Sequence, residues 1–239
     1  MVQGPALWAR RRSETGTAAL AVGPVVLVAD PAGALWHEPE SLLIVADLHL
    51  EKGSAYAERR VFLPPYDTAV TLARLAALIG HYRPKAVAAL GDSFHDVRAD
   101  ARMMQADRDS LRALQSGRDW IWIAGNHDPE VPREFGVPVA EMRVGSLVLR
   151  HEPRPGVDEP EIAGHLHPVA RVVSPSGSVR RRCFVGDGNR CVLPAFGAFT
   201  GGLNIRDVAF AALFSGRTRA HVMGRSAVYV VDTGKCVGE

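Results

Sequence analysis

The first half of the chain alternates short apolar runs with longer stretches whose apolar residues recur at helical spacing. Buried strands are predicted at residues 42–46, 86–90 and 120–124. Residues 68–82 place their apolar side chains on one face of a helix, which Gly80 and Pro84 are expected to end. A more polar helix is predicted for residues 99–116. Strands that alternate with helices indicate a partly parallel sheet.

Beyond residue 135 the helical spacing disappears and short strand candidates take its place. They lie at residues 139–144, 147–150, 161–163, 179–185, 208–213 and 227–231. We therefore expect an α/β fold in which two mixed β-sheets pack face to face with helices outside, a four-layer sandwich. No internal repeat or long linker divides the chain, so the expected organisation is a flexible segment at residues 1–20 and a single domain at 21–239.

Composition narrows the class of protein only slightly. The chain has 239 residues, of which 47% are hydrophobic, enough to build a substantial core. A formal net charge of +2 neither demands nor excludes an anionic partner. Three cysteines without a Cys-x-x-Cys spacing argue against a disulfide framework and against a thiolate zinc site. They indicate a reduced, cytoplasmic protein.

One feature near the start resembles an export signal. Arg10, Arg11 and Arg12 precede an apolar stretch at residues 18–29. That stretch contains Pro24 and several β-branched residues, which favour a strand, a turn and a second strand instead. No run reaches the ~20 apolar residues that a membrane helix needs, so we expect no membrane association.

Polar clusters rich in metal-binding side chains follow the predicted strands. They are Asp47-Leu48-His49, Gly91-Asp92, Gly125-Asn126-His127-Asp128, His151 and Gly164-His165-Leu166-His167. Each cluster alone has an ordinary explanation as a turn or a surface histidine. Together, at the carboxyl ends of successive strands, they are expected to converge on one crevice. Glycine precedes three of them and allows the backbone to turn sharply beside the metals.

The residue types predict which metals bind. Imidazole, carboxylate and amide oxygen without sulfur suit Mn²⁺, Fe, Zn²⁺ or Co²⁺ better than Ca²⁺ or a structural zinc. A shared carboxylate can hold two cations about 3.5–4 Å apart, the spacing used for in-line displacement at phosphorus. The nucleophile would then be a metal-held hydroxide.

These five blocks, in this order, resemble the signature of the calcineurin-like metallophosphoesterases. The resemblance implies two metals bridged by Asp92. It implies that one metal is held by Asp47, His49 and His167, and the other by Asn126, His151 and His165. It also implies that His127 stabilises the transition state or protonates the leaving oxygen, and that Asp128 orients it.

The chain departs from the superfamily pattern at one point. The usual second acid of Gly-Asp-x-x-Asp stands one residue later here, as Asp96. Asp92 as the bridge is unaffected. We interpret His95 and Asp96 as groups that support the ligands or face the substrate.

A narrower resemblance covers residues 25–210. Residues 47–54, 63–68, 91–96 and 194–204 are similar to the bacterial ligase-associated metallophosphoesterases of the DNA damage response. This resemblance implies a Mn²⁺-dependent phosphodiesterase with DNA endonuclease activity in DNA repair. It also implies that the protein is found with a DNA ligase, a helicase and an exonuclease.

Basic residues offer candidate contacts to a nucleic acid. Lys52, Arg59 and Arg60 follow the first metal motif and could bind phosphate. Without the family resemblance, a solvated helix face would be the preferred interpretation. We interpret residues 180–182, three arginines on a strand or hairpin, as protection of a sheet edge. The sequence contains no helix-turn-helix or zinc-finger motif.

Two other functions remain open on the sequence alone. The same metal site also serves phosphomonoesterases and nucleotide hydrolases. Some members of the superfamily keep the fold but lose the metals and act as interaction modules. The presence of every ligand and of His127 argues against that last alternative.

Overall fold

The computed structural model describes residues 16–61, 64, 66–174 and 177–239. Most of the segment 1–20, predicted to be flexible, lies outside these residues, as do Arg10, Arg11 and Arg12. The first strand begins at Ala18.

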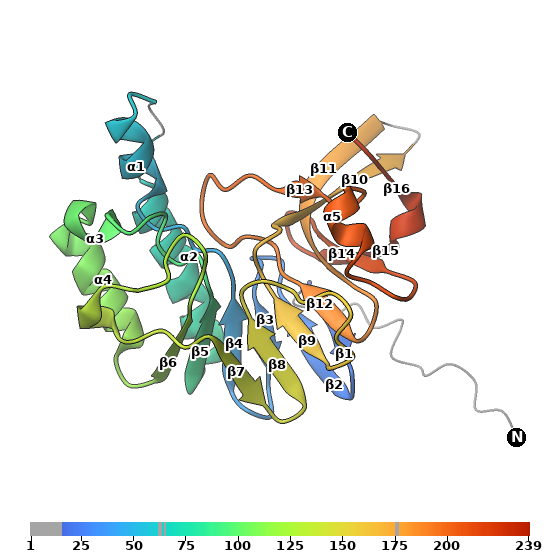
Figure 1. The fold of residues 1–239 in the computed structure, drawn as a ribbon, viewed down its shortest axis with the longest axis horizontal. Coiled ribbons are helices and arrows are strands. Elements are labelled where there is room, and N and C mark those ends of the chain that lie inside the picture. Colours follow the sequence, from blue (N-terminus) through green and yellow to red (C-terminus); the bar gives the residue numbers. More distant parts are fainter. Residues whose placement is uncertain (1–15, 62–63, 65, 175–176) are drawn as a thin grey trace, which may run out of the picture.

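A six-stranded mixed sheet forms the first half of the molecule (Figure 1). In spatial and chain order its strands are β1 (Ala18–Val22), β2 (Val25–Ala29), β3 (Leu35–His37), β4 (Leu42–Val45), β5 (Ala86–Leu90) and β6 (Asp119–Ile123). Strands β1 to β4 are antiparallel, whereas β4, β5 and β6 run parallel. The carboxyl ends of the three parallel strands therefore meet at one edge.

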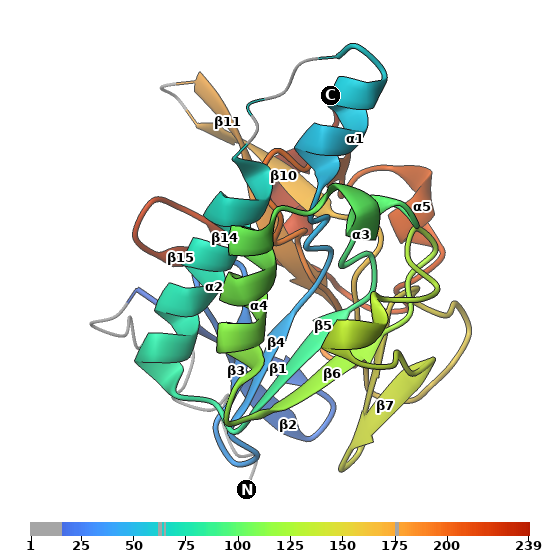
Figure 2. The ribbon, with the colours of Figure 1, turned by 90° about the vertical axis from the view of Figure 1, so that its left-hand side faces the viewer.

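Helices cover the outer face of this sheet. The helices of this half are α1 (Lys52–Glu58), α2 (Asp67–Tyr82), α3 (Ala99–Arg102) and α4 (Gln105–Gln115). Figure 2 shows α2 and α4 side by side over the strands. Leu75 of α2 and Leu111 of α4 are fully buried in the cluster that also contains Trp122 of β6. Their apolar stripe is the one that the helical spacing predicts.

The second sheet is larger and is also mixed. Its strands are β7 (Glu141–Val144), β8 (Leu147–Arg150), β9 (Glu161–Ala163), β10 (Pro168–Ser174), β11 (Gly177–Gly186), β12 (Arg190–Val192), β13 (Leu203–Asn204), β14 (Arg219–Met223), β15 (Val228–Asp232) and β16 (Cys236–Val237). Two 3₁₀ turns, at Arg133–Phe135 and Thr233–Lys235, connect neighbouring elements.

The main core lies between the two sheets. Leu27, Ile44 and Leu90 of the first sheet pack in one cluster with Leu149 and Phe184 of the second. A smaller cluster on the far face of the second sheet includes Phe210 of the short helix α5 (Val208–Ala211). The predicted α/β sandwich of two mixed sheets is confirmed, with a thinner helical layer on the second sheet than on the first.

Two predicted elements differ from the structure. Residues 208–213, predicted as a strand, form α5, because the side chain of Asp207 caps the helix by accepting a hydrogen bond from the Ala209 amide at 2.9 Å. The single helix predicted at 99–116 is two helices, because Met103 and Met104 adopt extended backbone conformations. Met103 is buried there at the junction.

Two further sequence expectations concern the whole chain. Among the described residues, every helix is too short or too polar to span a membrane. Cys183, Cys191 and Cys236 are buried free thiols. Burial raises the pKa of all three thiols, so they remain protonated and apolar in character.

Candidate metal centre

The candidate ligands of the first half come together because backbone pairing continues past the ends of the strands. The Asp47 amide donates to the Gly91 carbonyl at 3.2 Å, and the His49 amide donates to the Asp92 carbonyl at 2.9 Å. The segment after β4 therefore stays beside the segment after β5. This is how parallel strands deliver side chains from distant parts of the sequence to one edge.

The first cluster consists of Asp47, His49 and His167. The two histidine Nε2 atoms lie 3.3 Å apart, and Nε2 of His167 lies 3.2 Å from Oδ1 of Asp47. Asp47 and His49 are buried, and His167 is half-buried. Three ligand atoms thus converge on one small volume, as predicted for the first metal.

The second cluster combines Asn126, His151 and His165. Oδ1 of Asn126 lies 2.9 Å from Nε2 of His151 and 3.0 Å from Nδ1 of His165. The two histidine nitrogens are 3.2 Å apart. Nδ1 of His151 donates to the Leu90 carbonyl at 2.9 Å, so its Nε2 presents a lone pair to the cluster.

Asp92 stands between the clusters and faces both. Its Oδ1 lies 3.4 Å from Nε2 of His151, in the second cluster. Its Oδ2 lies 3.9 Å from Nε2 of His49, in the first. The His127 amide donates to Oδ1 at 2.9 Å and holds the carboxylate in this position.

The electrostatics of these groups favour cation binding. Burial, and then the neighbouring His167, lowers the pKa of His49 to about 2. Burial and His151 also lower the pKa of His165. Neutral imidazoles carry lone pairs, and lone pairs that converge with carboxylate oxygens repel one another unless a cation lies among them. The donor set therefore fits divalent metals.

The backbone of the centre is strained. Positive φ angles, which side chains other than glycine rarely adopt, occur at five candidate ligands: Asp47 (54°), His49 (44°), Asp92 (45°), His165 (72°) and His167 (48°). Each such residue costs about 1–3 kcal/mol, and residues of this kind gather at functional sites. The surrounding fold imposes these conformations and aims the side chains inward.

The predicted role of glycine beside the ligands is visible at Gly125, where a Cβ would overlap Oδ1 of Asp92, and at two further positions. Gly91 has a φ of +70°, and a Cβ there would overlap the ring of His151. A Cβ on Gly164 would lie 2.6 Å from Oδ2 of Asp47. All three backbones approach a ligand more closely than a side chain would allow.

His127 lies at the edge of the centre with its ring partly in solvent. Its side chain is 45% exposed, and its Nε2 lies 3.9 Å from Oδ2 of Asp92. Nδ1 faces the carbonyl oxygen of His95 at 3.1 Å. This exposure leaves Nε2 free to meet a substrate.

Asp128 does not contact the His127 ring, so its predicted orienting role is replaced by the carbonyl of His95. The buried carboxylate of Asp128 instead accepts hydrogen bonds from the amides of Ser93 (2.7 Å) and Phe94 (3.0 Å). Burial raises its pKa to about 7. Asp128 thereby shapes the loop that carries Asp92.

His95 and Asp96 have different surroundings. The His95 ring stacks on that of His127, with centroids 5.6 Å apart. Burial, and then Lys52, lowers the pKa of His95 to about 4, so this ring is neutral. Asp96 accepts hydrogen bonds from Arg102 at 2.8 Å and from the Arg98 amide at 2.9 Å, which ties it to the neighbouring helix. His95 therefore faces the centre, and Asp96 does not.

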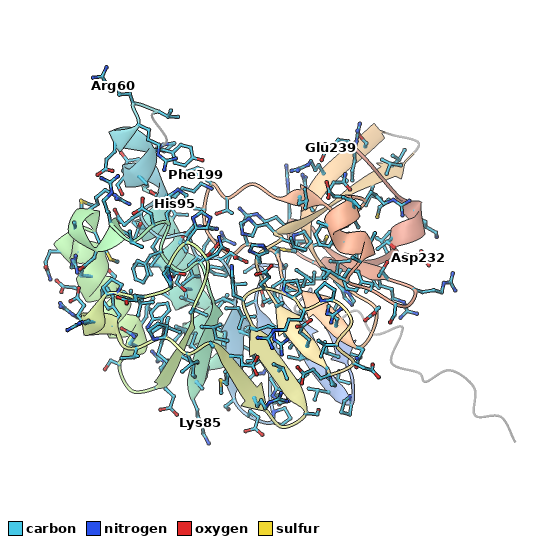
Figure 3. All side chains as sticks on the ribbon, viewed as in Figure 1. Arg60, Lys85, His95, Phe199, Asp232 and Glu239 are labelled. Atoms are coloured by element: carbon cyan, nitrogen blue, oxygen red, sulfur yellow. The ribbon has the colours of Figure 1, made fainter. Side chains whose placement is uncertain are left out.

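The basic residues after the first motif separate in space. Figure 3 shows Arg60 at the outer tip of the α1 arm, far from His95. Lys52 and Arg59 are close enough to lower the pKa of His95. Of the two arginines predicted to bind substrate, the structure thus brings only Arg59 near the centre.

One functional element was not anticipated from the sequence as part of the centre. The loop 195–203 runs between the two ligand-bearing turns: the Gly197 amide donates to the Asp47 carbonyl at 3.0 Å, and the Leu203 amide donates to the His167 carbonyl at 3.1 Å. The Arg182 guanidinium fastens this loop by donating to the carbonyls of Ala195, Gly197 and Thr200 at 2.9–3.1 Å. The arginine run 180–182 was the available signal, since alternate residues of a strand share one face.

Comparison with known proteins gives matches among solved structures. No protein-family model and no curated protein matches the sequence. Among solved structures, the chain is similar to the nuclease MPE of Pseudomonas putida, with 29% identity, a TM-score of 0.69, and coverage of 90% of this chain and 100% of that one. It also matches the E. coli phosphoesterase YfcE at 15% identity and a TM-score of 0.39, over 80% of this chain and 98% of the other.

The match to the nuclease spans the whole of that protein, and therefore both sheets and the edge between them where the two ligand clusters meet. It agrees with the resemblance found in the sequence motifs. The chain is accordingly a metal-dependent phosphoesterase with the two-sheet sandwich fold of the metallophosphoesterases.

Proposed function

We propose that this protein is a dinuclear phosphodiesterase that cleaves DNA, with Mn²⁺ as its metal. The observation that carries the proposal is the position of Asp92, whose two carboxylate oxygens face separate ligand clusters. A carboxylate shared in this way holds two cations at the spacing needed for displacement at phosphorus. The likeness to a nuclease favours a nucleic-acid substrate.

The chain's own residues divide into two ligand sets. Asp47, His49 and His167 would hold one metal, and Asn126, His151 and His165 the other, with Asp92 between them. When bound, such metals polarise the phosphate and lower the pKa of water towards neutrality.

His127 is the group that we assign to proton transfer. Because Nδ1 faces a carbonyl oxygen, the proton on that nitrogen stays in place. In the imidazolium form of the ring Nε2 carries a second proton, and this N–H stabilises the phosphoryl oxygens or gives its proton to the leaving oxygen, which leaves the neutral ring. The stacked, neutral ring of His95 supports this orientation.

The charges around the centre favour a diester over a monoester. A monoester dianion needs more positive charge at its non-bridging oxygens than a diester monoanion does. Lys52 and Arg59 are close enough to His95 to affect its pKa, and they could add positive charge beside the centre. In that position they suit a long polyanion that extends past the reacting phosphate.

The biological setting follows from the sequence resemblance to the ligase-associated enzymes. We place the protein in DNA repair, in the cytoplasm, as a nuclease that works with a DNA ligase, a helicase and an exonuclease. Their shared substrate would be damaged or broken DNA.

One preparation assayed with Mn²⁺ against three substrates tests the proposal. We expect cleavage of DNA and of a small chromogenic diester, with less activity on the matching monoester. DNA cleavage should fall steeply with added salt, since each neutralised phosphate releases counterions. Preference for monoesters or nucleotides without DNA cleavage would replace the nuclease assignment by the phosphatase alternative.

The two arginines of the α1 arm provide a matched pair for the same assay. Arg59→Ala should raise the KM for DNA, because Arg59 lies near His95. Arg60→Ala removes the same charge at the outer tip and should have a smaller effect. Equal losses of activity on DNA and on the small diester would show that Arg59 supports the fold of the centre and does not bind substrate.

A further inference from the structure

The β10–β11 hairpin carries a row of arginines on one face. Alternate residues of a strand share a face, so Arg180 and Arg182 of β11 point the same way, about 7 Å apart. Arg171 of β10 pairs directly with Arg180 and lies on that face too. We call Arg171, Arg180 and Arg182 the arginine row.

The row begins at the metal centre. Arg182 holds the loop that is hydrogen-bonded to Asp47. Arg180 donates to the Gly202 carbonyl at 2.7 Å, and Gly202 packs against the carbonyl of His167. The inner end of the row is therefore one loop away from the ligands of the first cluster, and Arg171 lies beside Arg180 on the neighbouring strand.

Placing Arg171 directly opposite Arg180 should lower the stability of the hairpin, and side-chain packing does not account for this arrangement. Like charges directly opposite each other on antiparallel strands are destabilising, and Arg171 faces Arg180 in that way. β11 pairs with β10 at residues 177–182 and with β12 and β14 only at residues 183–186, so Arg180 lies on a stretch paired on one side. Protection of that edge, the interpretation from sequence alone, requires no second arginine directly opposite Arg180. The pairing indicates a surface built to meet an anion.

An anion already lies on the row. The carboxylate of Glu239 accepts from Arg180 at 2.9 Å, and Arg180 and Arg171 both contribute to lowering its pKa. Arg180 and Glu239 are 45% and 63% exposed, so their ion pair is screened by water and contributes little. A phosphate with more charge and more acceptor oxygens can displace it.

The overall shape of the molecule indicates how a bound strand would run along the arginine row. The α1 arm and the free end of the hairpin project from the same end of the molecule in both views (Figures 1 and 2). In Figure 3, His95 and Phe199 lie between Arg60 on one arm and Glu239 beside the other. A strand entering the centre would pass along the hairpin.

We propose that the arginine row binds the phosphates of the nucleic-acid strand on one side of the cleaved bond, with Arg180 and Arg171 as the contacting residues. This inference rests on the proposed nuclease function. Arg182, held by three carbonyls, positions the loop at the inner end of the row.

The test compares the Arg171→Ala/Arg180→Ala variant with wild-type protein on a long oligodeoxynucleotide, at several salt concentrations in Mn²⁺. We expect a KM several-fold higher, and a slope of log KM against log salt that is smaller by about 1.4, for two lost contacts on a single strand. The KM for a small chromogenic diester, which has no second phosphate, should stay unchanged. Glu239→Gln should change the KM for DNA in the opposite direction.

Two matched variants distinguish phosphate binding by Arg171 and Arg180 from a general loss of positive charge and from a change in the fold. Arg217→Ala/Arg219→Ala removes the same charge beside Asp232, where Arg219 pairs with Gly186 at the opposite end of β11 from Arg180, and should leave the salt slope unchanged. Arg171→Lys/Arg180→Lys should retain most of the slope.

If wild-type protein cleaves DNA but loss of the row leaves KM and slope unchanged, or if the distant pair lowers the slope equally, the inference is overturned. If wild-type protein does not cleave DNA, the proposed function itself fails.

Discussion

At the residue scale, the centre is a set of side chains whose chemistry is complete only when they are near one another. Asp92 has two oxygens that face different clusters, and the neutral rings of His49 and His165 point lone pairs at carboxylate and amide oxygens. The strained backbone of these residues shows that the fold holds them there at a cost in stability.

Asp92→Ala should abolish activity and reduce bound metal together. Without the shared carboxylate, two cations would repel each other with one negative charge fewer between them. Metal analysis of the purified variant, alongside turnover, checks this. Two metals per chain in an inactive variant would show that Asp92 is not needed to bridge the metals.

His127→Ala should keep both metals and slow turnover by ~10²–10⁴, the usual effect of losing a proton-transfer group. Its ring belongs to neither ligand cluster, and its hydrogen bond to Asp92 comes from the backbone amide. The same metal analysis serves as the control. Loss of metal in this variant would make His127 a ligand.

His221, remote from the metals, should make the fold sensitive to acid. Burial, opposed by a hydrogen bond to the Ala19 carbonyl, lowers its pKa from 6.5 to about 4. As the pH falls below 6.5 the unfolded chain takes up the proton first, so stability is lost down to pH 4 and then levels off.

By pH 5 this loss amounts to about 2 kcal/mol. Urea unfolding of wild-type protein and of His221→Gln at pH 7 and pH 5 measures it. The variant should lose less stability than wild-type protein over this interval. Equal losses would show that the protonation of His221 does not differ between the folded and unfolded states.

At the element scale, the centre depends on loops that are fastened to one another. The segments after β4 and β5 pair through backbone hydrogen bonds, and the loop 195–203 links the Asp47 turn to the His167 turn. A loop held at several points has few conformations, so the ligands that it touches are pre-positioned for metal binding.

Arg182→Ala should loosen this loop and weaken metal binding. It removes three hydrogen bonds from a guanidinium whose pKa burial lowers to about 10. Hydrogen bonds from a charged group contribute about 1.5–3 kcal/mol each, so a loss of several kcal/mol is expected. Denaturation and Mn²⁺ titration measure the two effects. Unchanged Mn²⁺ affinity in a destabilised variant would show that Arg182 stabilises the fold without contributing to metal binding.

At the scale of the whole molecule, the candidate ligand clusters lie where the two sheets meet. Asp47 and Asp92 follow strands of the first sheet, whereas His151 and His165 follow strands of the second. Each ligand cluster therefore draws on both halves of the chain, and we expect metal binding to stabilise the packing of one sheet on the other.

A chelator should accordingly lower the Tm, and added Mn²⁺ should restore it. Ligands that bind only the folded state stabilise it by about 2.7 kcal/mol at one hundred times their Kd. Thermal unfolding with and without the chelator measures the shift, and Asp92→Ala should show a smaller one. A Tm that is the same in both conditions would mean that the metals contribute nothing to the fold.

The sequence by itself determined the fold class and the identity of the candidate ligands. Strands such as 86–90 and helices such as 68–82 carry their periodicity locally, so their pattern predicts them closely. The candidate ligands could also be recognised in the sequence, because metal-binding side chains lie next to strand ends and beside glycines. The helix at 208–211 was mistaken for a strand because its apolar residues suit either element, and one capping aspartate decides between them.

Only the tertiary structure decided which residues meet. The group facing His127 is a backbone carbonyl, which no residue type reveals in advance. The separation of Arg59 from Arg60 depends on where a short helix ends, and the position of Arg182 depends on strand register. Contacts between distant segments arise from the packing of whole sheets, and a one-residue change of register would turn the arginine row to the opposite face.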